Sequence, residues 1–319
     1  MNQRVQILRG AAICAVITIH TCVVGWGGGV VVIPLVNFAV AMFVFLSGLL
    51  TKKRTDCRYT DLMVRRLRKC LIPYVLWSFL CAGINGTIQT FIPDIFFSKC
   101  NGIYYFILVY AQMVILTPFA FRLLDSRLSW VGWLISPITI LLVRYVCVIR
   151  NIPLGFPFQG ELFAFWFIFY YLGLALGNHY YEIKMRQNVL WLTYVISILI
   201  QLIEGWIWYK NGNYDLATTQ LRLSSVLSSI IICIGAFLYI EKDRDSKEHF
   251  GLLWYLVIWI GNNSFGIYLC HMLVWRVINK VVPKVNVFPI STVLVIVGSL
   301  AFVNVGHRIT GKYAYLFGL

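Results

Sequence analysis

The chain has 319 residues, of which 60% are hydrophobic and 12% are charged, with a mean hydropathy of +0.79. A soluble chain of this length normally carries about a quarter of its residues as charges, so this composition excludes a soluble globular protein. The formal net charge of +15 does not indicate a nucleic-acid partner, because the basic residues lie mainly in short loops between apolar runs, as in membrane proteins.

Apolar segments recur along the whole chain, and most have the ~18 residues or more that a helix needs to cross the hydrocarbon of a bilayer. The runs are continuous and do not alternate, which indicates helices, since lipid-buried backbone must form helices or a closed barrel. The predicted spans are 5–26, 31–50, 71–93, 102–121, 129–149, 161–180, 189–209, 218–240, 252–276 and 288–306. We therefore expect an all-α fold, a polytopic integral membrane bundle of about ten transmembrane helices, with residues 1–319 as one domain.

The first span carries Arg9 near its start and His20 near its end. A cleavable signal peptide is the alternative, but no A-x-A-like site follows the apolar run, which ends in Trp26 and a glycine tract. We expect a retained helix, on which His20 lies about 16 Å from Arg9 at ~1.5 Å per residue.

Lysine and arginine are distributed unequally between the two sides of the predicted bundle. With the N-terminus inside, most of the 27 lysines and arginines fall in inner segments, above all in the run from Lys52 to Lys69. The positive-inside rule then places both termini in the cytoplasm.

Residues 52–70 combine apolar residues at helical spacing with many basic ones, and predict a basic interfacial cytoplasmic helix that runs into the third span. Contact with anionic lipids and a role in topology are one interpretation. A binding site for a polyanionic cytosolic ligand is the other.

Ionisable residues at membrane depth are costly, so each is a functional candidate. With the topology above, seven fall in the outer half of the bilayer: His20, Arg144, Glu161, Glu204, Arg222, His271 and Arg276. For Glu204 and Arg276, near helix ends, snorkelling to the interface is the alternative, and an ion pair with an arginine is the structural alternative for Glu161. The tryptophans at similar depth form either an aromatic belt or a sugar-binding vestibule; they are Trp26, Trp206, Trp208 and Trp275.

His20 and His271 are the candidates with the widest range of chemical roles, since a histidine within a membrane can be a proton relay, a metal ligand or a general base. No HxxxH pair supplies a metal site, the nine cysteines form no CxxC pair, and no GxSxG elbow occurs. We expect no metal and no disulfide framework.

Five stretches in order carry a family resemblance. From Arg9 the chain reads R-G-A-A-I-C-A-V-I-T-I-H, with ten residues between Arg9 and His20. The others are A-M-F-V-F-L-S-G (41–48), R-R-L-R-K-C-L-I-P-Y-V-L-W-S (65–78), Y-Y-F-I-L-V-Y-A-Q-M-V-I-L-T-P (104–118) and N-S-F-G-I-Y-L-C-H (263–271). Together they resemble the membrane-bound acyltransferase-3 family, which includes O-acetyltransferases of bacterial surface polysaccharides. Two departures are Gln6, where the family often has an acidic residue, and the pair Tyr104 and Tyr105, where a Trp-Phe pair is usual.

The resemblance implies an acyltransferase of a bacterial inner (cytoplasmic) membrane, a transferase of groups other than aminoacyl groups. It would move an acetyl or other short acyl group from cytosolic acyl-CoA to a hydroxyl of an extracytoplasmic glycan or a lipid-linked glycan precursor. Acetyl-CoA is then a donor substrate, and no permanently bound cofactor is expected. The partners expected are acyl-CoA, the glycan acceptor and membrane lipids. The alternative is a polysaccharide or lipid-linked sugar exporter or flippase without acyl transfer.

The resemblance also implies roles for individual residues. His20 would be the general base, with transfer through an acyl-histidine intermediate as the alternative. Arg9 would orient the acyl-CoA or stabilise charge on its carbonyl. The R-x-x-R pair, Arg65 and Arg68, would bind the CoA phosphates together with Arg66. The acceptor-binding or supporting candidates are His271, Glu161, Arg144, Arg222 and Tyr105.

Overall fold

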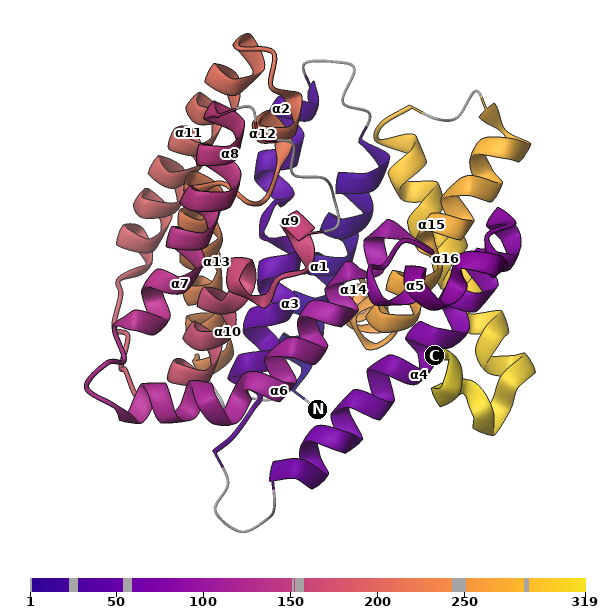
Figure 1. Cartoon of the computed structure of the whole chain (residues 1–319), viewed down its shortest axis with the longest axis horizontal. Helices are drawn as coiled ribbons and strands as arrows, with labels where there is room; N and C mark the ends of the chain where they lie inside the picture. The colour runs from indigo at the N-terminus through magenta and orange to yellow at the C-terminus, as the bar shows by residue number, and fades with distance from the viewer. Residues whose placement is uncertain are drawn as a thin grey trace. The chain divides into compact units, whose positions relative to one another are not determined.

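The computed structural model describes residues 2–22, 28–53, 59–150, 152, 158–242, 251–283 and 287–319. In these ranges the regular elements are helices, without a strand (Figure 1). The α-helices are α1 (Gln3–Thr21), α2 (Gly28–Val36), α3 (Phe38–Leu49), α4 (Tyr59–Asn85), α5 (Phe91–Phe96), α6 (Tyr105–Asp125), α7 (Val131–Ile140), α8 (Cys147–Ile149), α9 (Phe158–Glu161), α10 (Phe163–Gly177), α11 (Gln187–Lys210), α12 (Tyr214–Thr218), α13 (Leu223–Glu241), α14 (Leu252–Asn262), α15 (Ser264–Val281) and α16 (Ile290–Thr310). Short 3-10 turns lie at Ile88–Thr90, Gly102–Tyr104 and Gly311–Phe317, and a π-helical turn at Leu141–Val146. The all-α prediction is confirmed.

The number of long apolar helices is lower than the ten predicted. Among the described residues, seven helices are long and apolar enough to cross a membrane, or eight if the bent pair α14 and α15 counts as one span. The first predicted span, α1, is too polar because its first turns carry Gln3, Arg4, Gln6 and Arg9. The sixth, α10, has only 15 residues. The chain is therefore a multi-pass helical membrane protein, with fewer long spans than its apolar runs predict.

The helices fall into two compact units, Met1–Leu46 with Tyr181–Val305, and Ser47–Tyr180 with Gly306–Leu319. We call them the first and the second unit. Each is built from separate stretches of the chain, and the chain passes from one to the other within α3, between Tyr180 and Tyr181, and within α16. The prediction of one domain over residues 1–319 stays a prediction.

In the first unit, α1 packs closely on α14 through two glycines. A Cβ atom on Gly10 would lie 2.3 Å from the carbonyl oxygen of Val257, and one on Gly261 would lie 1.9 Å from that of Gln6. Small residues of this kind let helix backbones approach within membranes. The chain then bends by 82° between α14 and α15. As a result, α1 contacts both arms of the bent pair.

A polar network joins α11 to α13 inside the first unit. The Gln201 amide donates to Ser225 Oγ (2.9 Å) and accepts from Ser228 Oγ (2.7 Å). Asn37, between α2 and α3, donates to the same Ser225 Oγ (3.4 Å). All four side chains are buried. Interhelical hydrogen bonds of this kind hold helices together where the hydrophobic effect does not distinguish protein from lipid.

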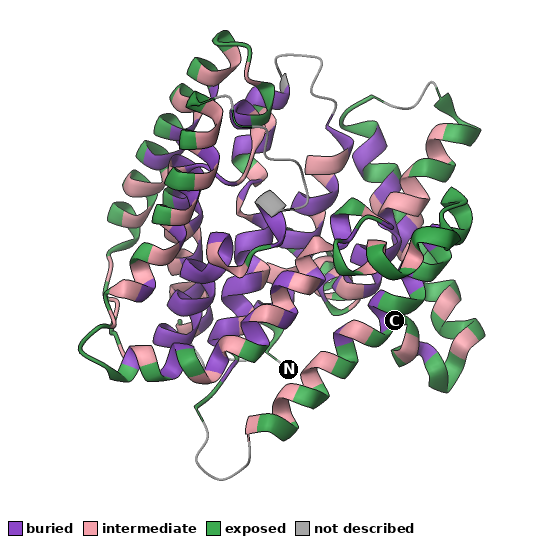
Figure 2. Cartoon of the chain, in the orientation of Figure 1, coloured by how far each residue is buried: buried purple, intermediate pink, exposed green. Residues whose placement is uncertain are grey.

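The core of the second unit is α10, whose residues from Phe165 to Gly177 are all buried (Figure 2). The end of α3 lies against it through two further glycines. A Cβ on Gly48 would lie 2.3 Å from the Tyr170 carbonyl oxygen, and one on Gly177 would lie 2.2 Å from that of Leu49. Gly48 closes the F-L-S-G stretch, so close backbone packing explains the glycine of that motif.

The chain is broken at Leu162, where the backbone is extended between α9 and α10. Gln112 of α6 binds the backbone groups on both sides of the break. Its Nε2 donates to the Glu161 carbonyl (2.7 Å), and its Oε1 accepts from the Phe163 N–H (2.9 Å). Trp166 Nε1 donates to the Gly160 carbonyl (2.9 Å). Broken helices are tolerated at membrane depth when neighbours satisfy the freed backbone groups in this way.

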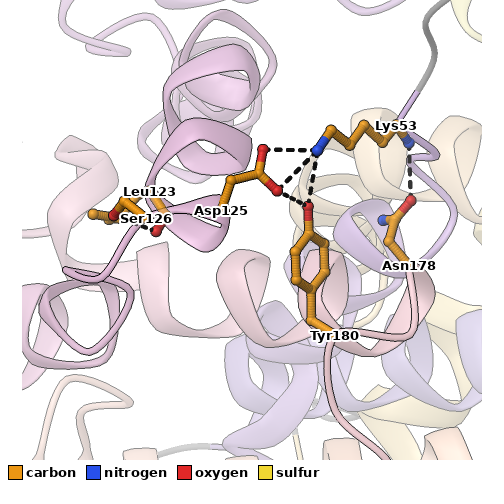
Figure 3. A network of polar contacts seen from close by, with 6 residues as sticks. All are labelled: Lys53, Leu123, Asp125, Ser126, Asn178 and Tyr180. Carbon is orange, nitrogen blue, oxygen red and sulfur yellow. Dashed lines mark hydrogen bonds and ion pairs between the residues drawn. The ribbon is translucent and has the colours of Figure 1, made fainter.

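The segment that follows α3 is attached to α6 and α10 by polar contacts (Figure 3). Lys53 Nζ donates to both oxygens of Asp125, at the end of α6, at 2.8 and 2.7 Å, and to the hydroxyl of Tyr180 (3.3 Å). The Asn178 amide accepts from the Lys53 backbone N–H and donates to the Thr51 carbonyl, both at 2.9 Å. The hydrogen bond to Asp125 raises the pKa of the Lys53 ammonium.

Helix α4 continues from Tyr59 to Asn85 without a break, so its first turns and the third predicted span form one helix. The predicted basic helix at 52–70 is therefore helical from Tyr59 onward, and residues 54–58, with Arg54 and Arg58, lie outside the described residues. Its position at a membrane interface stays a prediction. The apolar side chains exposed along α4, such as Phe79 and Ile84, fit a surface that faces lipid.

Candidate active site

Two histidines that lie far apart in the sequence are neighbours in the first unit. His20, in the last turn of α1, and His271, in the middle of α15, have ring centroids 5.6 Å apart. His271 is 0% exposed and His20 is partly buried. The contact between α1 and α15 that follows the bend after α14 brings the two rings together.

The hydrogen bonds of His271 define its protonation state. Its Nδ1 lies 2.8 Å from the carbonyl oxygen of Tyr268 and 3.2 Å from that of Ile267. Since carbonyl oxygens only accept, Nδ1 carries the proton. A second proton would leave a buried cation without a counter-charge, which is costly. Nε2 is therefore an unprotonated acceptor, and it is buried without a hydrogen-bond partner in the described part of the chain.

Arg9 lies on the same helix as His20, and α1 is unbroken between them. Eleven residues correspond to about three turns, so both side chains leave one face of α1, about 16 Å apart along its axis. Arg9 and His20 thus stand on the same side of α1, about three turns apart.

Arg222 is the third candidate in the first unit, and it is 0% exposed. It precedes α13, and its guanidinium packs against α11 beside Gly205, where a Cβ atom would lie 2.8 Å from Nη1. Glu204, which precedes Gly205 in α11, is partly buried and accepts a hydrogen bond from Trp208 Nε1 (3.4 Å). Arg222 is thus part of the interface between α11 and α13, beside the polar network of Gln201.

Three residues that are candidates for binding or supporting the acceptor lie in the second unit. Tyr105 stacks on Trp166, with ring centroids 6.3 Å apart, and Trp166 in turn binds the carbonyl next to Glu161. Glu161 is buried, and its Oε1 has no hydrogen-bond partner within the described ranges. Arg144 is buried in the π-helical turn. Tyr105 and Glu161 thus belong to one cluster at the start of α10.

The three arginines of α4 face different surroundings. Arg65 and Arg68 are exposed, three residues apart on one side of the helix. Arg66 is half-buried, and its Nη1 donates to Thr51 Oγ1 (2.7 Å), while Thr51 donates in turn to the Ser47 carbonyl (2.7 Å). Two arginines are therefore accessible to a polyanion, and the third also joins α4 to the end of α3.

Two polar residues of the site were not assigned a role from the sequence. Gln6, where related sequences often have an acid, is buried on α1, and both polar atoms of its amide lack a partner in the described part of the chain. Gln112 bridges the break before α10. Gln112 stands in the family-like stretch 104–118, but a glutamine in an apolar run has no spacing signal that predicts a backbone break.

Two further expectations concern metals and aromatic residues. No group of three or more histidine, cysteine or acidic side chains that could hold a metal occurs among the described residues.

Of the four tryptophans, Trp26 lies outside the described residues. Trp206 is 52% exposed and stacks on Tyr209, which fits an aromatic belt better than a vestibule.

These features define a multi-pass helical membrane protein with a pair of imidazoles inside one of its units. A family model described as an acyltransferase domain matches residues 2–305, and the chain therefore belongs to the acyltransferase-3 family. No curated protein and no solved structure shows significant similarity to the chain. The resemblance seen in five stretches is thus confirmed over nearly the whole sequence, and the protein is a membrane acyltransferase.

Proposed function

We propose that the protein is an O-acetyltransferase that moves an acetyl group from cytosolic acetyl-CoA to a hydroxyl of an extracytoplasmic glycan or its lipid-linked precursor. The observation that carries this proposal is the contact between His20 and His271 in a member of the acyltransferase-3 family. An exporter has no need of a base, whereas transfer to a hydroxyl near pKa ~15 requires one.

In the proposed reaction, His20 removes the proton of the acceptor hydroxyl. The hydroxyl oxygen attacks the thioester carbonyl carbon, the new C–O bond forms, and the C–S bond breaks. The imidazolium then returns its proton to the thiolate, which leaves as CoA. Neutral imidazole is suited to both steps because it takes up and releases a proton near neutral pH.

The donor is proposed to enter from the cytoplasmic side, where Arg65 and Arg68 are available for its phosphates. Arginine binds phosphate through two parallel hydrogen bonds, which favours these exposed side chains. Of the two roles considered for Arg9, the 16 Å of helix to His20 favours orientation of the acyl-CoA over charge stabilisation at the reacting carbonyl.

The acceptor is proposed to bind near His271, with Arg222 as a supporting residue of the same unit. Glu161, Arg144 and Tyr105, which belong to the second unit, stay candidates for acceptor binding or support. The protein would lie in a bacterial inner membrane with both termini in the cytoplasm, as its lysines and arginines favour. It would need no permanent cofactor.

The test uses purified protein, acetyl-CoA labelled in the acetyl group, and surface glycan extracted from the producing cells. We expect label to appear in the glycan with the wild type and to fall by at least about a hundredfold with His20→Ala. The matched control is His307→Ala, because His307 is exposed on α16. Glycan that stays unlabelled with the wild type, while vesicles containing the protein move it across the membrane, would favour the exporter.

A further inference from the structure

Helix α15 carries, on one side, three buried polar atoms without a partner among the residues that the structure describes. Nε2 of His271, Nε1 of Trp275 and Oδ1 of Asn279 are buried and lack a hydrogen-bond partner in the described ranges. No other described helix has more than one residue of this kind. The three residues follow at intervals of four, so they lie along one face of the helix, over about 12 Å.

The exposure pattern of α15 shows that this face is turned inward. Arg276, Val277, Lys280 and Val281 are exposed, whereas the residues between them are partly buried. On the flank, Gly298 of α16 lies against the Val274 side chain, whose Cγ1 would be 2.8 Å from a Cβ atom on Gly298. The row of unpartnered atoms is thus on the protein side of α15, where lipid tails could not satisfy it.

The chemistry of the row alternates along the helix. His271 Nε2 accepts, since its Nδ1 is held by the Tyr268 carbonyl. Trp275 Nε1–H only donates, and Asn279 Oδ1 only accepts. A buried polar group without a partner costs about 1–3 kcal/mol, and more in lipid, so three in a row indicate that a ligand supplies partners. A chain of hydroxyl groups can do so, because each hydroxyl both donates and accepts.

We propose that His271, Trp275 and Asn279 form a binding row for the hydroxyls of the glycan acceptor, leading to His20. This inference rests on the proposed function for the identity of the ligand. One hydroxyl donates to His271 Nε2, a second accepts from Trp275 Nε1–H, and a third donates to Asn279 Oδ1. His20, with its ring 5.6 Å from that of His271, then faces the hydroxyl at the end of the row.

Two substitutions remove single atoms from the row and keep the shape of the side chain. Trp275→Phe removes the indole N–H, and Asn279→Leu removes the amide at similar volume. We expect each to raise the KM for extracted surface glycan by roughly three- to tenfold, the effect of one lost hydrogen bond, with an unchanged KM for acetyl-CoA. The thermal unfolding midpoint should not fall, since the atoms removed have no partner within the protein. The matched control is Trp191→Phe, whose ring is 59% exposed on α11.

Equilibrium binding of the same glycan to the purified protein, measured without acetyl-CoA, separates this inference from the proposed reaction. Wild-type protein that binds glycan, with weaker binding in both variants, supports the row even if no acetyl is transferred. Variants that keep the wild-type affinity and KM for glycan would overturn it, as would a rise in the KM for acetyl-CoA alone, which assigns the row to the donor. A lower unfolding midpoint with unchanged glycan binding would also overturn it, because the residues would then serve only the fold.

Discussion

Three arginines within four positions of α4 differ in what they contact, and this predicts different effects of their removal. Arg65→Gln and Arg68→Gln should each raise the KM for acetyl-CoA by about tenfold, because a charged hydrogen bond to phosphate is worth about 1.5–3 kcal/mol. Neither should change the unfolding midpoint, since both side chains are exposed. Steady-state kinetics at two salt concentrations checks this, with the effect smaller at high salt.

Arg66→Gln should behave differently, because the Arg66 side chain donates to Thr51. We expect a lower unfolding midpoint together with a weaker KM effect than at Arg65. Equal kinetic effects at all three positions, without loss of stability at Arg66, would contradict this division of roles.

At the same scale, the sequence singles out candidate side chains but does not reveal which of them are neighbours. His20 and His271 are candidates because an ionisable residue is costly in an apolar helix and because both stand in family-like stretches. Their contact does not follow, since it depends on the 82° bend between α14 and α15, for which the run 252–276 gives no signal. The sequence gives no sign of a binding role for Asn279 either, because a single asparagine near a helix end is common at the membrane–water interface.

The break before α10 gives a prediction at the scale of elements. Gln112→Met keeps the volume of the side chain but removes both hydrogen bonds to the backbone at Glu161 and Phe163. We expect a loss of about 2–4 kcal/mol in the free energy of unfolding, since two buried backbone groups lose their partner. Ile115→Met, on an exposed face of the same helix, is the matched control. An unchanged stability in Gln112→Met would show that other groups satisfy the break.

The close packing of α1 on α14 gives a second prediction for these elements. Gly261→Ala places a Cβ atom 1.9 Å from a backbone oxygen, which cannot move as a flexible side chain can. We expect a loss of about 1–3 kcal/mol in stability and a drop in acyl transfer, because α1 carries His20. Gly83→Ala is the control: its nearest neighbour would be 3.9 Å away, so the change should be neutral or slightly stabilising. A Gly261→Ala protein as stable and active as the wild type would contradict the packing.

Helix positions follow well from the apolar runs, and the exceptions have physical reasons. Runs such as 189–209 and 218–240 correspond to long helices. The run 161–180 contains the break at Leu162, where Gln112 of α6 and Trp166 bind the freed backbone groups. Such breaks depend on contacts between helices, so the hydropathy of one segment does not reveal them.

At the scale of the whole molecule, the distribution of basic residues predicts that both termini face the cytoplasm. This topology requires an even number of crossings over the whole chain and two crossings before Lys52, so it needs α1 to cross the membrane as well as the helix at Gly29–Leu49. A fluorescent protein fused after Leu319 should therefore fluoresce, and a phosphatase fused there should be inactive. The reverse result would place the basic helix α4, and with it the proposed donor site, on the wrong side for cytosolic acyl-CoA.

The most direct measurement is the acetylation of surface glycan in cells that carry His20→Ala, with the variant protein at its normal level in the membrane. The proposed mechanism requires the acetyl content of the glycan to fall to that of cells lacking the protein, while His307→Ala leaves it unchanged. Undiminished acetylation with His20→Ala would remove this imidazole from the reaction and contradict the account.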